Sequence, residues 1–133
     1  MASIFTKIVN REIPGYIVAE DDQTIAFLDI SPIAQGHTLV VPKQEVDYVF
    51  DLDDALLAHV HVFAKKVAKA IKAVVPCNRV GVAVVGLEVP HAHVHLVPLN
   101  TMADLDFNKP KLSLSQENFE ALQQQISAAF NNQ

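Results

Sequence analysis

The segment Asp51–Val75 constrains the fold most, because its apolar residues recur at steps of three and four, which is the period of one helix face. Aspartates gather at its start and lysines in its second half, an arrangement that suits the helix dipole. Pro76 then ends the helix. The apolar face consists of Leu52, Leu56, Val60, Phe63, Val67, Ile71 and Val74.

Two further helices and five strands are predicted around this segment. One helix runs from about Ser115 to Phe130, capped by Ser113 or Ser115, and a short one covers about residues 3–10. Helices and strands do not alternate, which predicts an α+β fold with a mainly antiparallel sheet. The expected strands are Tyr16–Glu20, Thr24–Asp29, His37–Val41, Arg79–Gly86 and His91–Leu99.

Composition places the chain among globular proteins. Its 133 residues are 50% hydrophobic and 19% charged, and we expect one domain over residues 1–133. A net charge of −5 argues against binding to the phosphate backbone of a nucleic acid. The single cysteine, Cys77, excludes an intramolecular disulfide. No apolar run has the length of a membrane span and the start lacks a secretion signal, so we expect a cytoplasmic protein with no membrane partner.

Three histidines alternate with apolar residues at His91, His93 and His95. Alternation is typical of a strand, where residues two apart share a face, so the three imidazoles are expected in one row. They could be ordinary hydrogen-bonded side chains. They could also bind a metal, with His37 as a candidate further ligand, or provide a nucleophile for phosphorus chemistry.

Residues 91–97 read His-φ-His-φ-His-φ-φ, where φ is apolar, and so resemble the histidine triad (HIT) family. Upstream, residues 25–32 and 36–43 are similar to a second conserved block of that family. The opening residues 4–8, together with 12–14, resemble its Hint branch. The resemblance covers about residues 3 to 99, which leaves a C-terminal helix at about 113–131.

This resemblance implies an α+β fold with a five-stranded antiparallel sheet, two main helices and a two-fold homodimer. It also implies a hydrolase or transferase that attacks the α-phosphate of nucleoside 5′-phosphoramidates or dinucleoside polyphosphates through a nucleotidyl-histidine intermediate. The expected ligand is a purine nucleotide such as AMP or GMP. Neither a cofactor nor a metal is expected for the chemical step.

The resemblance also implies roles for particular residues. His93 corresponds to the nucleophile, His95 to a group contacting phosphate oxygens or the leaving group, and His91 and His37 to supporting histidines. Asp29 corresponds to the acceptor for the ribose hydroxyls. The positions that line the base pocket are Ile4, Phe5, Ile8, Phe27, Leu28, Ile30 and Leu39.

The chain departs from the family pattern in two places. Ser3 and Thr6 stand where many Hint-branch members have Cys-x-x-Cys, so no structural zinc is expected there. Leu87 and Glu88 stand where the family has polar residues that hold phosphate. The second departure keeps an alternative open, a nucleotide-binding or scaffolding module with weak or no catalysis. A metalloenzyme that uses the triad as ligands is a further alternative.

Overall fold

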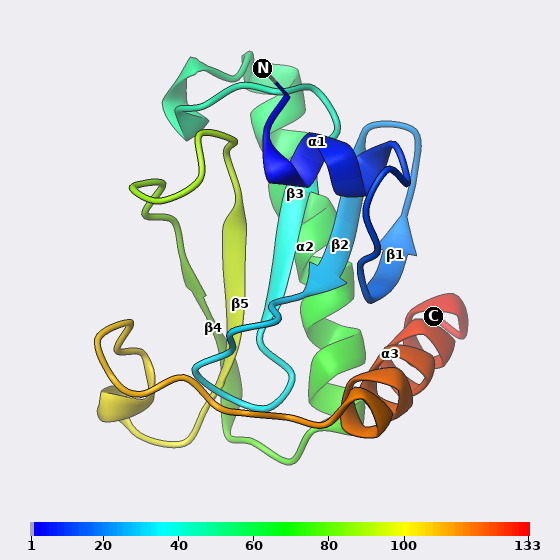
Figure 1. The fold of residues 1–133 in the computed structure, drawn as a ribbon, viewed down its shortest axis with the longest axis vertical. Coiled ribbons are helices and arrows are strands. Elements are labelled where there is room, and N and C mark those ends of the chain that lie inside the picture. The colour runs from blue at the N-terminus through cyan, green and yellow to red at the C-terminus, as the bar shows by residue number, and fades with distance from the viewer. Residues whose placement is uncertain (1) are drawn as a thin grey trace.

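A computed structural model describes residues 2–133, and its centre is a five-stranded antiparallel sheet (Figure 1). The strand order is β1-β2-β3-β5-β4, which makes β1 and β4 the two edges. The predicted α+β class and five-stranded sheet are therefore confirmed. The strands are β1 (Ile17–Glu20), β2 (Thr24–Leu28), β3 (Thr38–Pro42), β4 (Arg79–Ala83) and β5 (Val94–Leu99).

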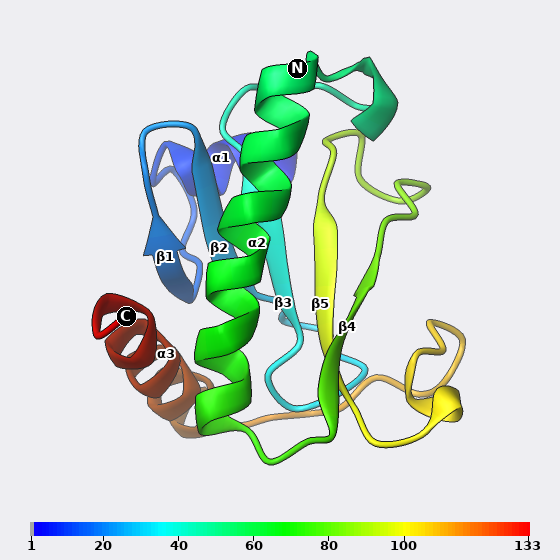
Figure 2. The same cartoon turned by 180° about the vertical axis from the view of Figure 1, so that it is seen from behind.

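Helices lie on both faces of this sheet. The long helix α2 (Asp54–Val74) crosses one face, with α3 (Gln116–Asn131) beside it, whereas α1 (Ile4–Val9) lies on the opposite face (Figures 1 and 2). Two short 3₁₀ turns, Val49–Asp51 and Met102–Asp104, complete the helical structure of the described chain. None of its helices has the combination of length and apolar character that crossing a membrane requires. The cytoplasmic location stays a prediction.

Each α-helix begins at a residue whose side chain accepts a hydrogen bond from a free backbone amide. Ser3 caps α1, Asp53 caps α2 and Ser115 caps α3, accepting from the amides of Thr6, Leu56 and Asn118. Such a cap satisfies an amide that has no partner within the helix and is worth about 1 kcal/mol. Of the two serines predicted as the cap of α3, Ser115 is the one observed.

Strand register separates the side chains of the sheet into two sets. Paired residues of antiparallel neighbours point to the same face, and Phe27 pairs with Leu39, which pairs with His95. These side chains therefore face α1. The adjacent row, in which Ala26 pairs with Val40 and Val40 with Val94, faces α2. The main core thus lies on the α2 side of the sheet, and His95 lies on the α1 side.

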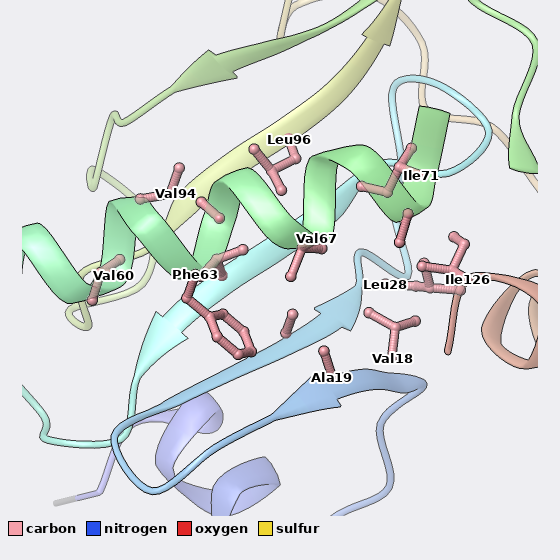
Figure 3. Packing of buried hydrophobic residues seen from close by; sticks show 14 of the residues in the cluster. Val18, Ala19, Leu28, Val60, Phe63, Val67, Ile71, Val94, Leu96 and Ile126 are labelled. Atoms are coloured by element: carbon pink, nitrogen blue, oxygen red, sulfur yellow. The ribbon is translucent and has the colours of Figure 1, made fainter. Parts of the chain in front are cut away.

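The main core lies between α2, α3 and the sheet, and Figure 3 shows the side chains meeting there. Val67 and Ile71 of α2 and Ile126 of α3 have no exposed surface. Burial of a side chain of this size stabilises the fold by roughly 1.5–3 kcal/mol. On the other face, a smaller cluster joins α1 to the sheet and consists of Phe5, Ile8, Ile25, Phe27, Leu39 and Val41.

Two predicted strands are each three residues shorter than expected. The strand predicted from His91 begins at Val94, and the one predicted to reach Gly86 ends at Ala83. For the first of these the cause is non-local, because the amide of Ala92 donates to the Val46 carbonyl at 2.7 Å rather than to a strand. The helix predicted from Asp51 begins at Asp54, since Val49–Asp51 forms a separate 3₁₀ turn.

Candidate active site

A cavity of about 500 Å³ opens on the α1 side of the sheet. Its walls are α1, the ends of β2 and β3, the loop between β4 and β5, and a segment that follows β5. Three of the four predicted catalytic residues, His37, His93 and His95, line it. All eight residues predicted to bind the nucleotide also line it, namely Ile4, Phe5, Ile8, Phe27, Leu28, Asp29, Ile30 and Leu39.

The fourth histidine, His91, does not line the cavity but is fully buried beside it. Its Nε2 lies 2.7 Å from the carbonyl oxygen of Pro42, which can only accept, so we assign the ring proton to Nε2. Its Nδ1 then accepts from the Ser3 hydroxyl at 2.7 Å. The expected row of three imidazoles on one strand is corrected: only His95 belongs to a strand, and the His93 ring lies beside it in the cavity whereas His91 does not line the cavity. His91 and His93 precede β5 and are held by other partners.

Ser3, Thr6 and Glu45 form a polar cluster around His91. The Glu45 Oε1 atom accepts from the Ser3 amide and from the Thr6 hydroxyl, each at 2.6 Å. These two bonds, the one from Thr6 foremost, lower the pKa of Glu45 to about 2. Hydroxyls thus stand where the family resemblance places a cysteine pair, and they fix α1 to the loop after β3 and to His91.

His93 is oriented by the backbone just before it. Its Nδ1 lies 2.6 Å from the carbonyl oxygen of His91, so Nδ1 carries the proton and donates. Nε2 is therefore left with a lone pair, which is the nucleophilic form of a neutral imidazole. The ring packs between Phe5 and His95, with centroid distances of 5.0 Å and 4.9 Å.

His37 and His95 form a hydrogen-bond chain with a defined direction. The Ile33 amide donates to His37 Nδ1 at 3.2 Å, so the proton of the neutral His37 ring is on Nε2. That atom lies 2.9 Å from His95 Nδ1 and donates to it. The neutral His95 ring therefore carries its proton on Nε2, which makes Nε2 a hydrogen-bond donor for a group bound in the cavity.

Burial keeps the supporting histidines neutral at pH 7. Desolvation lowers the pKa of His37 and of His91. Desolvation, followed by repulsion from the charged forms of His93 and His37 and from Lys111, lowers the pKa of His95 to about 3. The hydrogen-bond chain is consistent with this result, because it satisfies neutral rings and leaves no acceptor for an additional proton on His95 Nδ1.

The opposite end of the cavity is apolar. The Phe5 and Phe27 rings meet edge to face at 5.4 Å, above the small cluster of the sheet. Ile30 is exposed at the rim. Asp29 lies at the histidine-lined end, where its Oδ1 accepts from the Ser31 amide at 2.8 Å and its Oδ2 lies 3.6 Å from His37 Nε2. The cavity therefore joins an apolar slot to a polar, histidine-lined end.

Asp29, His37 and His95 are the residues best placed to hold a metal ion. They form the one group among residues 2–133 whose three ligand atoms lie within 4.8 Å of one another. His37 Nε2 and His95 Nδ1 already share a hydrogen bond, so a metal bound through these two atoms would have to replace it. His91 and His93 lie outside the group, so the three triad histidines do not assemble as metal ligands.

Sequence reasoning did not find the contribution of residues 105–112, the segment between the last 3₁₀ turn and α3. Phe107, Asn108 and Lys111 of this segment line the cavity. The segment has no periodicity, and its placement depends on contacts with residues far away in the sequence. Leu87 and Glu88, the second departure from the family pattern, also line the cavity, on the loop between β4 and β5.

Comparison with known proteins identifies the family. The model of the HIT domain matches residues 10–102. The chain is 38% identical to an uncharacterized HIT-like protein of Borreliella burgdorferi over 93% of this chain and 95% of that protein. It is 35% identical to the adenosine 5′-monophosphoramidase of Schizosaccharomyces pombe, over 96% and 98% of the two chains.

The fold agrees with these sequence matches. The solved structure of a hypothetical histidine triad nucleotide-binding protein from Sulfolobus tokodaii superposes with a TM-score of 0.82. It is 32% identical in sequence, and the match covers 96% of this chain and 91% of that one. Because sequence and fold agree over most of its length, the chain belongs to the HIT domain family.

Proposed function

We propose that this protein is a nucleotide hydrolase or transferase that attacks the α-phosphate of purine nucleoside 5′-phosphoramidates through His93. The observation that carries the proposal is the 2.6 Å hydrogen bond from His93 Nδ1 to the His91 carbonyl, because it leaves the Nε2 lone pair free in a cavity with an apolar slot. The similarity to a yeast adenosine 5′-monophosphoramidase supports the choice of substrate class.

In the proposed reaction, His93 Nε2 forms a bond to the α-phosphorus while the bond from phosphorus to the leaving amine breaks. The amine takes up a proton from water. Positive charge develops on the His93 ring, and the His91 carbonyl stabilises it by accepting from Nδ1. Water then attacks the phosphorus of the nucleotidyl-histidine, which releases the nucleoside monophosphate and restores neutral His93.

The remaining cavity residues have binding roles in this proposal. His95 Nε2–H donates to a phosphate oxygen, and His37 holds the His95 ring in the tautomer that makes this possible. Asp29 accepts from the ribose hydroxyls. The purine base lies in the apolar slot against Phe5 and Phe27, where aromatic and aliphatic side chains cover its faces.

The test measures turnover of a fluorogenic adenosine 5′-phosphoramidate by wild type and by His93→Ala, with and without EDTA. We expect turnover that EDTA does not affect and that His93→Ala abolishes. The matched control is His61→Ala, which removes an exposed histidine of α2 that bonds only to the backbone of its own helix. Full activity in His93→Ala would refute the nucleophile assignment.

A second candidate function is a nucleotide-binding module with weak turnover, and Leu87 and Glu88 favour it. Leu87 offers no hydrogen bond, and the Glu88 carboxylate repels a phosphate that comes near it. This candidate predicts tight AMP binding without turnover in wild type. Gain of turnover in the Glu88→Gln variant would show that the carboxylate is the cause.

We also propose that two copies of the chain associate through the free edge of the sheet. The edge strand β4 and the loop after it expose Val82, Val84, Val85 and Leu87, and an unpaired apolar edge favours pairing with another strand. Light scattering after gel filtration tests this association. We expect a dimer that Val82→Lys dissociates, and a monomeric wild type would refute it.

A further inference from the structure

Residues 105–112, the segment between β5 and α3, cover the histidine end of the cavity. The Phe107 ring lies 4.7 Å from the His95 ring and 6.2 Å from the His37 ring. The Leu112 amide donates to the Pro32 carbonyl at 2.8 Å, which fixes the segment to the loop between β2 and β3. In Figure 1 this segment, in orange, runs across the lower end of the sheet towards α3.

Lys111 brings a positive charge to this end of the cavity. Its Nζ donates to the Phe107 carbonyl at 2.6 Å, which bends the segment so that both residues line the cavity. Among the described residues lining the cavity, Lys111 is the only lysine or arginine, and Asp29 and Glu88 are the acidic ones. The charge of Lys111 also lies near enough to lower the pKa of both His37 and His95, although burial has the larger effect on each.

Without Lys111, a nucleotide phosphate in this cavity would meet no Lys or Arg side chain from the described part of the lining. His37 and His95 are neutral, so they offer hydrogen bonds but do not compensate the charge of a phosphate. The two carboxylates of the lining oppose it. The loop between β4 and β5, with Leu87 and Glu88, supplies no cationic side chain either. The ammonium group of Lys111 has three donors, and only one is used by the Phe107 carbonyl.

We propose that Lys111 binds the phosphate of the nucleotide and so supplies the charge that the loop between β4 and β5 lacks. The inference rests on the proposed function, because it takes the ligand to be a nucleotide whose phosphate lies at the histidines. Lys111 is then a phosphate-binding residue contributed by a segment outside the triad and outside residues 25–32 and 36–43, which resemble the family.

The experiment compares the affinities of AMP and of uncharged adenosine by isothermal titration calorimetry. We expect wild type to bind AMP more tightly than adenosine. We expect Lys111→Gln to lose about tenfold in AMP affinity with no change for adenosine, which is the lower end of the range for a lost charge-assisted hydrogen bond, since Lys111 is exposed. Lys111→Arg keeps the charge and is expected to retain most of the preference for AMP.

Lys109→Gln is the matched control, because Lys109 belongs to the same segment but does not line the cavity. We expect it to bind both ligands like wild type. An equal loss of AMP and adenosine affinity in Lys111→Gln would overturn the inference, since it would mean that the lysine only holds the segment in place. Unchanged AMP affinity would also overturn it. If wild type binds neither ligand, the proposed function itself is refuted, and the inference falls with it.

Discussion

Acidification from pH 7 to pH 5 is expected to destabilise the protein through its buried histidines. The pKa of His95 is about 3 in the folded protein, against 6.5 in an unfolded chain. Below pH 6.5 the unfolded chain therefore binds more protons than the folded one. The stabilisation is complete above pH 6.5 and is lost as the pH falls towards 3.

The size of the effect follows from the two pKa values. A pH of 5 lies about 1.5 units below the pKa of 6.5 in the unfolded chain. Protonation of this histidine in the unfolded chain therefore lowers the free energy of unfolding by about 2 kcal/mol. His37 and His91 shift in the same direction and add to the loss. Glu45 and Asp21, whose pKa values are about 2, titrate mainly below this interval. The interval from pH 5 to pH 7 therefore reports on the histidines.

Urea unfolding at pH 7 and pH 5 measures the loss, with His95→Gln as the test variant and His61→Gln as the control. We expect wild type and His61→Gln to lose at least about 2 kcal/mol between the two pH values, and His95→Gln to lose about 2 kcal/mol less. NMR titration of the His95 ring provides a direct check in the folded protein. Equal pH dependence in wild type and His95→Gln, or protonation of His95 above pH 5, would refute the reasoning.

Three substitutions test the fold. Gly36→Ala is expected to cost about 1–3 kcal/mol in thermal unfolding, because the φ of Gly36 is 92° and a Cβ there would lie 2.9 Å from Val75 Cγ2; wild-type stability would contradict this. Ile126→Ala should cost about 2–5 kcal/mol in urea unfolding, since Ile126 has no exposed surface, whereas the exposed Gln124→Ala should be neutral. Ser3→Ala removes both the cap of α1 and a partner of buried His91, so we expect a loss of about 1–3 kcal/mol, and a neutral result would show that water replaces the hydroxyl.

The sequence predicts those parts of the fold in which burial follows a local period. α2 and α3 are recognisable because one face of each helix is apolar, and Ser115 is a local cap. Strands β2 and β3 pair Phe27 with Leu39, and the family resemblance predicts that both residues line the base pocket. Fold class can therefore be obtained from short-range patterns, whereas the predicted cavity residues follow from the family resemblance.

The parts that the sequence does not predict depend on partners far away along the chain. His91 and His93 alternate like strand residues, but the Ala92 amide pairs with Val46 and the His91 ring with Pro42 and Ser3. The segment 105–112 has no period at all and is placed by Pro32 and by the histidine rings. Periodicity carries no information about such contacts.

The hydrogen-bond chain from the Ile33 amide through His37 to His95 has a consequence for the choice of substrate. A peptide amide holds its proton at any pH of interest, so the chain cannot refill from behind if His95 gives its proton away. Loss of that proton would leave an imidazolate, which is far too basic to form here. In the proposed reaction, His95 can thus polarise the phosphate by donating a hydrogen bond but cannot protonate the leaving amine, which takes its proton from water. In a series of amine leaving groups, turnover should therefore fall steeply as the amine becomes more basic, and weakly basic aromatic amines should be released fastest.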